Sequence, residues 1–248
     1  MYFVMSICDR NIGVEFSHHY TFQQCRNYIT NEDKPDFNIK SESNYDKGSI
    51  HNFLTFEGFN SNALFVENSI RAEYYNILQQ ITLTLIDYSI ILLHGATIAH
   101  SIGAYHFTAP SGTGKTTHIL KWLSNYPEAF VVNGDKTFLK FEDDGTVLAC
   151  GSPWAGKENM HTNTMVPLKA IVLMERAEDN HIEQISFAEA FPFLLQQVYR
   201  PEDEEKMRKT LRLMQRLGKS VTFWRFQCNN FKDDCFQVAY EALVGKSL

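Results

Sequence analysis

The chain has 248 residues, of which 44% are hydrophobic and 13% aromatic, and its formal net charge is −6. This much apolar material can fill a sizeable core, so the composition excludes a disordered chain. The acidic balance disfavours a general nucleic-acid binder, which needs clustered Lys and Arg against phosphates. We therefore predict no nucleic-acid partner.

The cysteines and the apolar segments indicate in which cellular compartment the protein is found. The five cysteines are irregularly spaced and form no CxxC pair, which disfavours a disulfide framework and a zinc site. Free thiols fit a reducing compartment. The first residues, MYFVMSICDR, lack the basic flank and the cleavage site of a signal peptide. The longest apolar stretch, 90–99, is too short to span a bilayer. We predict a cytoplasmic protein with no membrane partner.

The first part of the chain differs in composition from the rest. Residues 1–66 show little helical periodicity and are rich in Asn, Ser and aromatic residues. Strands are predicted there at 2–7, 12–16 and 50–56, with a polar connection over 31–47. We predict a small β-rich N-terminal region over 1–66 and a main domain over 67–248.

The main domain begins with an amphipathic helix predicted over 69–88, with a cap at Asn68 or Ser69. Strands at 90–93 and 104–108 follow, separated by a turn at 100–103, and a helix is predicted from 115 to about 123. Further strands are predicted at 129–132, 137–141, 147–150, 168–174 and 221–228, and helices at 187–197, 202–217 and 231–244. The apolar run at 168–174 is typical of a strand that is buried on both faces. Because strands and helices do not alternate regularly, we predict an α/β fold with a mixed sheet.

The most informative segment reads HFTAPSGTGKTT and lies between a predicted strand and a predicted helix. It matches the phosphate-loop template G-x-x-x-x-G-K-[ST] at Gly114, Lys115 and Thr116, with Ala109 in place of the first Gly. Gly112 and Gly114 allow the backbone to approach phosphate oxygens, and the loop amides and helix N-terminus donate to an anion. Lys115 would contact the β- and γ-phosphates, and the Thr116 hydroxyl can bind Mg²⁺.

The cofactors predicted from this loop are ATP and Mg²⁺, bound by Ser111, Gly112, Thr113, Gly114, Lys115, Thr116 and Thr117. The loop alone does not distinguish a kinase from other nucleotide-binding classes. A GTPase would carry an NKxD element, which the sequence lacks, and a motor or helicase would be longer. A P-loop kinase is therefore the leading interpretation.

Three further segments accompany the loop. His94-Gly95 ends one hydrophobic strand, Asn133-Gly134-Asp135 follows another, and GSPWAGKEN forms a Gly- and Pro-containing loop. Together with the P-loop they resemble the kinase domain of the HPr kinase/phosphorylase family and its shorter HPr-kinase-like relatives. The matching runs are LLHGATIAHSIGAYHFTAPSGTGKTTH, VVNGDKTFL and GSPWAGKEN…PLKAIVLMER.

The resemblance implies a mixed α/β sheet similar to that of phosphoenolpyruvate carboxykinase. It also implies phosphoryl transfer from a nucleotide, usually to a Ser hydroxyl, and homo-oligomer formation. HPr kinases proper carry two adjacent Asp where this chain has Gly134-Asp135, and an E-x-R-G signature where it has PWAGKEN. These departures imply an acceptor other than HPr.

Individual roles follow from the pattern and the resemblance together. Asp135 is predicted to bind Mg²⁺ with the P-loop hydroxyl of Thr116, or to act as the base, and His94 is the alternative base. Lys157 would neutralise charge on the transferred phosphoryl group, and Glu158 would orient the metal or the acceptor. Arg225 is a further candidate phosphate contact. The predicted catalytic residues are His94, Lys115, Asp135, Lys157 and Glu158.

Two hypotheses of function remain open at this stage. The first is a kinase acting on a hydroxyl of a peptide, a protein or a small molecule, with a peptide Ser as the first choice. The second is a non-catalytic ATP-binding regulator whose N-terminal region reports nucleotide binding to a partner. The single Asp favours the regulator, whereas His94, Asp135 and Lys157 favour the kinase.

Overall fold

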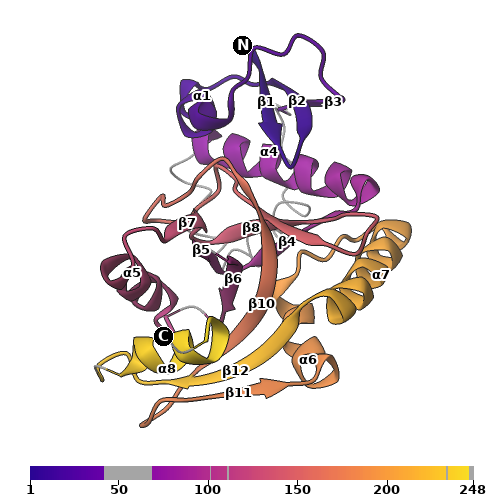
Figure 1. Ribbon diagram of the computed structural model, residues 1–248. Coiled ribbons are helices and arrows are strands. Elements are labelled where there is room, and N and C mark those ends of the chain that lie inside the picture. Colours follow the sequence, from indigo (N-terminus) through magenta and orange to yellow (C-terminus); the bar gives the residue numbers. More distant parts are fainter. Residues whose placement is uncertain (42–68, 101, 111, 233, 246–248) are drawn as a thin grey trace.

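The computed structural model describes residues 1–41, 69–100, 102–110, 112–232 and 234–245. These residues form a mixed α/β fold with two sheets (Figure 1). In the smaller sheet, β2 pairs antiparallel with β1 and parallel with β3. The bounds of these strands are Tyr2–Ile7 for β1, Arg10–Glu15 for β2 and Phe37–Lys40 for β3.

The larger sheet is organised around one long strand, β10 (Met165–Arg176). The described strands follow the order β4-β8-β9-β10-β6-β5-β7, and β12 pairs with β10 and with β11. Their bounds are Ile90–His94 (β4), Ala96–His100 (β5), Gly103–Thr108 (β6), Phe130–Asn133 (β7), Lys136–Phe141 (β8), Val147–Cys150 (β9), His181–Ile185 (β11) and Thr222–Cys228 (β12). The start of β10 pairs antiparallel with β9, and the rest lies between the parallel strands β6 and β12. The sheet is therefore mixed and curled, which confirms the predicted α/β class.

Helices cover both faces of this sheet (Figure 1). Their bounds are Lys115–Asn125 (α5), Phe187–Gln197 (α6), Glu204–Ser220 (α7) and Cys235–Leu243 (α8). Ala170 and Val172 of β10 lie in the core under α5 and α8, whereas Ile171 and Leu173 lie in the core under α6 and α7. Successive side chains on a strand point to opposite faces, so the prediction of a strand buried on both faces is confirmed.

The helix α4 (Ser69–Leu85) joins the smaller sheet to the larger one. Its residues Ile77, Leu78 and Ile81 are fully buried in a core that also contains Ile12 of β2 and Phe138 of β8. The two sheets therefore share apolar contacts through α4. The boundary between residues 66 and 67 stays a prediction.

A buried carboxylate fixes the helix α1 (His19–Cys25) against α4. Glu73 is fully buried and accepts hydrogen bonds from the backbone amides of Ser17 (2.9 Å) and His18 (3.1 Å) and from the hydroxyl of Thr21 (2.7 Å). The His18 ring (2.9 Å) and the Ser41 hydroxyl (3.2 Å) complete the set. Burial alone would raise the pKa of Glu73, but the hydrogen bonds from Thr21, His18 and Ser17 outweigh it and leave the pKa below its usual value.

Glu73→Gln is expected to destabilise the fold by about 2 kcal/mol at neutral pH, because an amide accepts fewer and weaker hydrogen bonds than a carboxylate. Since the folded pKa is lowered, this stabilisation is full above the unfolded pKa and is lost as the pH falls through the folded pKa. Urea unfolding of the parent and the variant at several pH values measures the difference. Glu32→Gln, at an exposed site, is the control. Equal stability of parent and Glu73→Gln at neutral pH would contradict the prediction.

The connection between α6 and α7 lies between two helices that each begin with a side-chain cap. A capping box begins α6, in which the Ser186 side chain accepts from the Glu189 amide (3.3 Å) and Glu189 accepts from the Ser186 amide (2.9 Å). Asp203 caps α7 by accepting from the Lys206 amide (2.8 Å). The Asp203 cap fixes where α7 begins, and thereby the end of the connection at residues 198–203.

Several elements were missed in the prediction, or have other bounds than predicted. β5 runs through His100, where a turn was expected, because all five of its residues are buried and pair with neighbouring strands. α1 lies in a region predicted to lack helices, β3 lies inside the predicted 31–47 connection, and α8 begins later than 231. The mostly exposed strand β11 has only Ile182 and Ile185 as apolar residues, and it pairs with β12. The predicted strand at 50–56 and the cap residue Asn68 lie outside the described residues.

Within the described ranges, no helix is long and apolar enough to cross a membrane. The two longest, α4 and α7, have 17 residues each, and α7 is strongly charged. The cytoplasmic location stays a prediction.

Candidate active site

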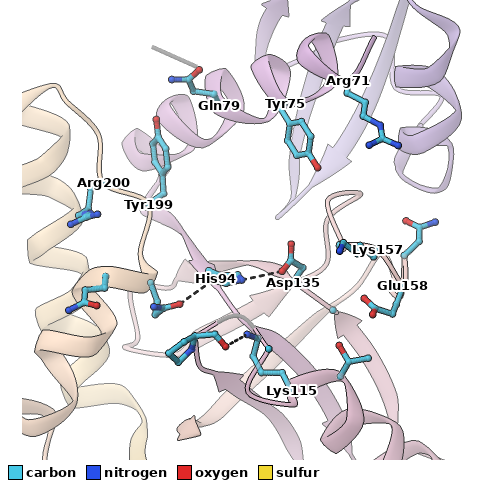
Figure 2. Close-up of a pocket in the computed structure, with 18 of the residues that line it drawn as sticks. Arg71, Tyr75, Gln79, His94, Lys115, Asp135, Lys157, Glu158, Tyr199 and Arg200 are labelled. Carbon is cyan, nitrogen blue, oxygen red and sulfur yellow. Dashed lines mark hydrogen bonds and ion pairs between the residues drawn. The ribbon is translucent and has the colours of Figure 1, made fainter. Parts of the chain in front are cut away.

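A cavity of 1670 Å³ lies where β4 and β6 end, between α5 and α4 (Figure 2). Single-ligand sites usually have volumes of roughly 300–1,000 Å³, so this cavity has room for two ligands. The predicted site residues that line it are His94, Gly112, Gly114, Lys115, Thr116, Thr117, Asp135, Lys157 and Glu158. Thus the fold brings residues from four separate segments to one cavity.

The phosphate loop has the backbone geometry that an anion site needs. Gly114 has φ +109° and is the N-cap of α5, and a Cβ there would lie 2.2 Å from Nδ2 of Asn230. Only glycine meets both conditions without strain. Because the N-cap residue of α5 is a glycine, it has no side chain to cap the helix, and the first amides of the helix can donate to an anion.

Lys115 closes the loop with its ammonium group. Its Nζ donates to the carbonyl oxygen of Ala109 at 2.8 Å. Burial lowers the pKa of Lys115, and the nearby charge of Asp135 opposes that effect. A phosphate in the loop would favour the charged form of Lys115, so this cation fits a phosphate ligand.

Neighbouring strand ends hold the loop in place. Arg176, the last residue of β10, donates to the Gly112 carbonyl, and Nδ2 of Asn230 donates to the Gly114 carbonyl at 3.1 Å. The Thr113 hydroxyl donates to the Pro110 carbonyl at 2.9 Å, and Thr113 does not line the cavity. Thr113 therefore shapes the loop, and Ser111 lies outside the described residues.

The side chains of His94 and Asp135 contact each other in the cavity that the phosphate loop also lines. Nε2 of His94 lies 3.2 Å from Oδ1 of Asp135, and Nδ1 lies 3.0 Å from Oε1 of Gln197 (Figure 2). Because a carboxylate oxygen only accepts, Nε2 carries a proton at this contact. Burial would raise the pKa of Asp135, but the hydrogen bond from His94 and the charge of Lys136 outweigh it and hold the pKa well below its usual range. Asp135 is thus ionised at neutral pH.

Lys136 is the nearest cation to Asp135. Its ammonium group contacts the Asp135 carboxylate, and its side chain is almost fully buried. The turn that presents both residues is fixed by Asn133, whose Oδ1 accepts from the backbone amides of Asp135 (2.8 Å) and Lys136 (2.6 Å). This Asx turn aims Asp135 into the cavity.

Hydrogen bonds to the main chain hold the end of β4 next to Asp135 and next to the end of β6. The Gly95 amide donates to the Asp135 carbonyl at 2.8 Å, and the Thr108 hydroxyl donates to the His94 carbonyl at 2.8 Å. Beneath them lies His106, whose Nδ1 is 2.8 Å from the Thr97 hydroxyl. Burial lowers the pKa of His106 to about 3, so this ring is neutral and adds no charge to the site.

The loop after β9 brings Lys157 and Glu158 to the cavity. Gly156 has φ +74°, and a Cβ there would lie 3.0 Å from Cβ of Asp135, so the loop passes close to the carboxylate. Its base is tied to α4, because Nε1 of Trp154 donates to the Tyr74 carbonyl (3.3 Å) and the Tyr74 hydroxyl donates to the Pro153 carbonyl (2.8 Å). The prediction of a shaped loop agrees with these contacts.

Arg225 is not a phosphate contact, and that prediction is wrong. Its guanidinium lies 3.2 Å from Glu183 and 3.7 Å from Glu175, and it does not line the cavity. β12 pairs with β10 and β11, and this pairing directs Arg225 to neighbouring strand residues.

Sequence reasoning missed several residues that line or support the site. Among them are Arg71, Tyr75, Lys136, Gln197 and Arg200. Lys136 had a signal, because a lysine opening a buried strand is unusual. The others sit on helices or connections whose position depends on the tertiary fold, and no local pattern marks them.

The described residues contain no group of three His, Cys, Asp or Glu that could hold a metal ion. The predicted magnesium ligands, Thr116 and Asp135, both line the cavity. Mg²⁺ usually takes one or two protein oxygens and completes its shell with water and substrate phosphates. This pair of oxygens fits such a shared site.

No protein-family model matches this sequence, and none of the curated proteins matches it. Among solved structures, it is similar to the Hpr(Ser) kinase/phosphatase from Coxiella burnetii. The two share 12% identity and a TM-score of 0.38, over 62% of this chain and 87% of that chain. The identity and the TM-score are too low for this likeness to carry a conclusion about activity. What stands is a mixed α/β protein with a P-loop sequence at a large cavity.

Proposed function

We propose that this chain is an ATP-dependent kinase that transfers the γ-phosphoryl group to a hydroxyl of a peptide, protein or small molecule, with Ser as the first choice. One observation carries the proposal. A loop with the phosphate-loop sequence, a glycine at the helix N-cap and a half-buried lysine lines the same cavity as an ionised aspartate that is paired with a histidine. Phosphoryl transfer needs anion binding and a proton acceptor side by side.

The geometry favours Asp135 over His94 as the base. Nε2 of His94 carries a proton that it donates to Asp135, so this nitrogen cannot accept a second proton. Asp135 would take the proton of the acceptor hydroxyl as the new oxygen–phosphorus bond forms and the bond to the ADP oxygen breaks. Lys115 and Lys157 would stabilise the negative charge of the transferred group.

Mg²⁺ would be held by Thr116 and would neutralise charge on the phosphates. Asp135 is its second protein ligand in the alternative in which His94 is the base. The resemblance to HPr kinases supports ATP and Mg²⁺ as the cofactors. It also supports a homo-oligomer, which is testable by light scattering.

The alternative is a non-catalytic ATP-binding regulator of the same fold. It is favoured by the contacts of Asp135, whose charge is already offset by Lys136 and by the hydrogen bond from His94. A carboxylate used in this way could serve to hold the turn. The kinase remains our proposal because Asp135 also lines the cavity beside Lys115.

The proposal predicts that the purified protein binds Mg-ATP and transfers phosphate to a hydroxyl compound, but not to HPr. Labelled ATP is incubated with panels of peptides, proteins and metabolites, including HPr, and products are identified by mass spectrometry. Gly134 and PWAGKEN replace features of true HPr kinases, so only a slow background reaction with HPr is expected. Saturable phosphorylation of HPr would contradict this acceptor assignment. Binding of ATP without transfer to any acceptor would favour the regulator.

A further inference from the structure

One face of α4 borders the cavity along much of the helix. Arg71, Tyr75, Gln79 and Leu83 follow one another in steps of four, and all four line the cavity. Residues four apart lie on one side of a helix, and at 1.5 Å per residue this row is about 18 Å long. We call these four residues the α4 ledge. Figure 2 shows α4 on the opposite side of His94 and Asp135 from Lys115.

The α4 ledge is rigidly attached to the rest of the site. Gln79 is hydrogen-bonded to the hydroxyl of Tyr199, and the Tyr199 amide donates to the Leu92 carbonyl of β4 at 2.9 Å. On the other side, Tyr74 of α4 is bonded to the loop that carries Lys157. A ligand on the ledge would therefore have a fixed position relative to Asp135.

Two arginines flank this space. Arg71 lies at the start of the ledge, and Arg200 lies on the connection between α6 and α7; Figure 2 shows them on opposite sides of His94 and Asp135. Both are exposed, and no ion pair joins either one to another described residue. Glu202 and Asp203 also line the cavity near Arg200 in the chain, and Asp203 accepts from the Lys206 amide as the cap of α7. One arginine at an end of the ledge and a second on the α6–α7 connection, neither in an ion pair with another described residue, favour a ligand with negative charge on both sides of its centre.

The length of the ledge distinguishes between kinds of acceptor. An extended peptide rises about 3.3 Å per residue, so about five or six residues match 18 Å. A small hydroxy compound could reach Asp135 without contacting both arginines. The neutral middle, formed by Tyr75 and Gln79, suits the uncharged residue that carries the hydroxyl.

We propose that the α4 ledge binds the acceptor, and that the acceptor is an extended peptide segment with acidic residues on both sides of its hydroxyl-bearing residue. This inference rests on the proposed kinase function. Arg71 and Arg200 bind the flanking carboxylates, and the hydroxyl faces Asp135, which takes its proton as in the transfer described above.

The test uses fluorescent peptides with one central Ser and acidic, neutral or basic flanks. Fluorescence anisotropy measures peptide binding with and without a non-hydrolysable Mg-ATP analogue, and mass spectrometry measures phosphorylation with Mg-ATP. We expect acidic flanks to improve binding over basic flanks by about fivefold or more, since an exposed ion pair contributes up to about 1 kcal/mol. Arg71→Glu is expected to reverse the preference at one flank, and Arg200→Glu at the other.

Arg212→Glu is the matched control, because Arg212 is exposed on α7 and does not line the cavity. It should leave the preference unchanged. Equal binding of acidic and basic peptides would overturn the proposal. So would equal effects of Arg71→Glu and Arg212→Glu, or phosphorylation of small hydroxy compounds with no peptide bound. Calorimetry of Mg-ATP binding is a separate measurement, so a failure of the kinase function is distinguished from a failure of the ledge.

Discussion

Lys115→Ala is expected to lower phosphotransfer by about a thousandfold while leaving the fold intact. Lys115 is the cation that the P-loop itself supplies, and removing one electrostatic contact to the transition state typically costs a factor of about 10² to 10³. The fold should persist because the side chain bonds its own loop, mainly at the Ala109 carbonyl. Turnover and thermal melting are measured together on the parent and the variant.

Lys219→Ala is the control, since Lys219 is an exposed residue of the last turn of α7. Turnover of Lys115→Ala near the parent level, with an unchanged melting curve, would remove the P-loop from the catalytic site. If Lys115→Ala lowers the melting temperature, turnover is measured on Lys115→Met instead, because methionine keeps the apolar stem of the side chain.

Asp135→Asn is expected to lower turnover by about a hundredfold or more, which corresponds to about 3 kcal/mol, with little effect on nucleotide binding. The amide keeps the size of the carboxylate and can still accept from His94. It cannot take a proton from a hydroxyl, and it leaves the charge of Lys136 without its counter-ion. Turnover and ATP affinity are measured well below the melting temperature, because a buried unpaired lysine also lowers stability.

Asp143→Asn provides the matched control, because Asp143 is exposed in the turn between β8 and β9. Unchanged turnover in Asp135→Asn would limit Asp135 to holding its turn. His94 would then be the stronger candidate for the base, and His94→Gln would be the variant to measure.

Prediction from the sequence succeeded where neighbouring residues in the chain specify the structure. The helix predicted at 187–197 has the bounds of α6, Phe187–Gln197, because its cap, its first-turn Glu and its apolar spacing are all local. The P-loop segment was found because the chemistry of phosphate binding requires Gly, Lys and Thr at fixed spacing. β5 was missed because Gly95 separates it from β4 by a single residue and made the apolar run look interrupted.

The sequence by itself determined the mixed α/β class. It also marked the segment with the phosphate-loop sequence, His94 and Asp135 as candidate site residues, since each of these motifs consists of residues close together in the chain. Only the tertiary structure decided that Gln197 contacts His94, which is 103 positions away in the sequence. The tertiary structure also decided that Arg71 and Arg200 face the same cavity as Lys115. The tertiary structure likewise decided where α1 lies, because the Glu73 carboxylate of α4, a helix distant in the chain, accepts hydrogen bonds from its first turn. Such contacts arise from the pairing of distant strands and helices, and no periodicity or spacing in one segment specifies its distant partner.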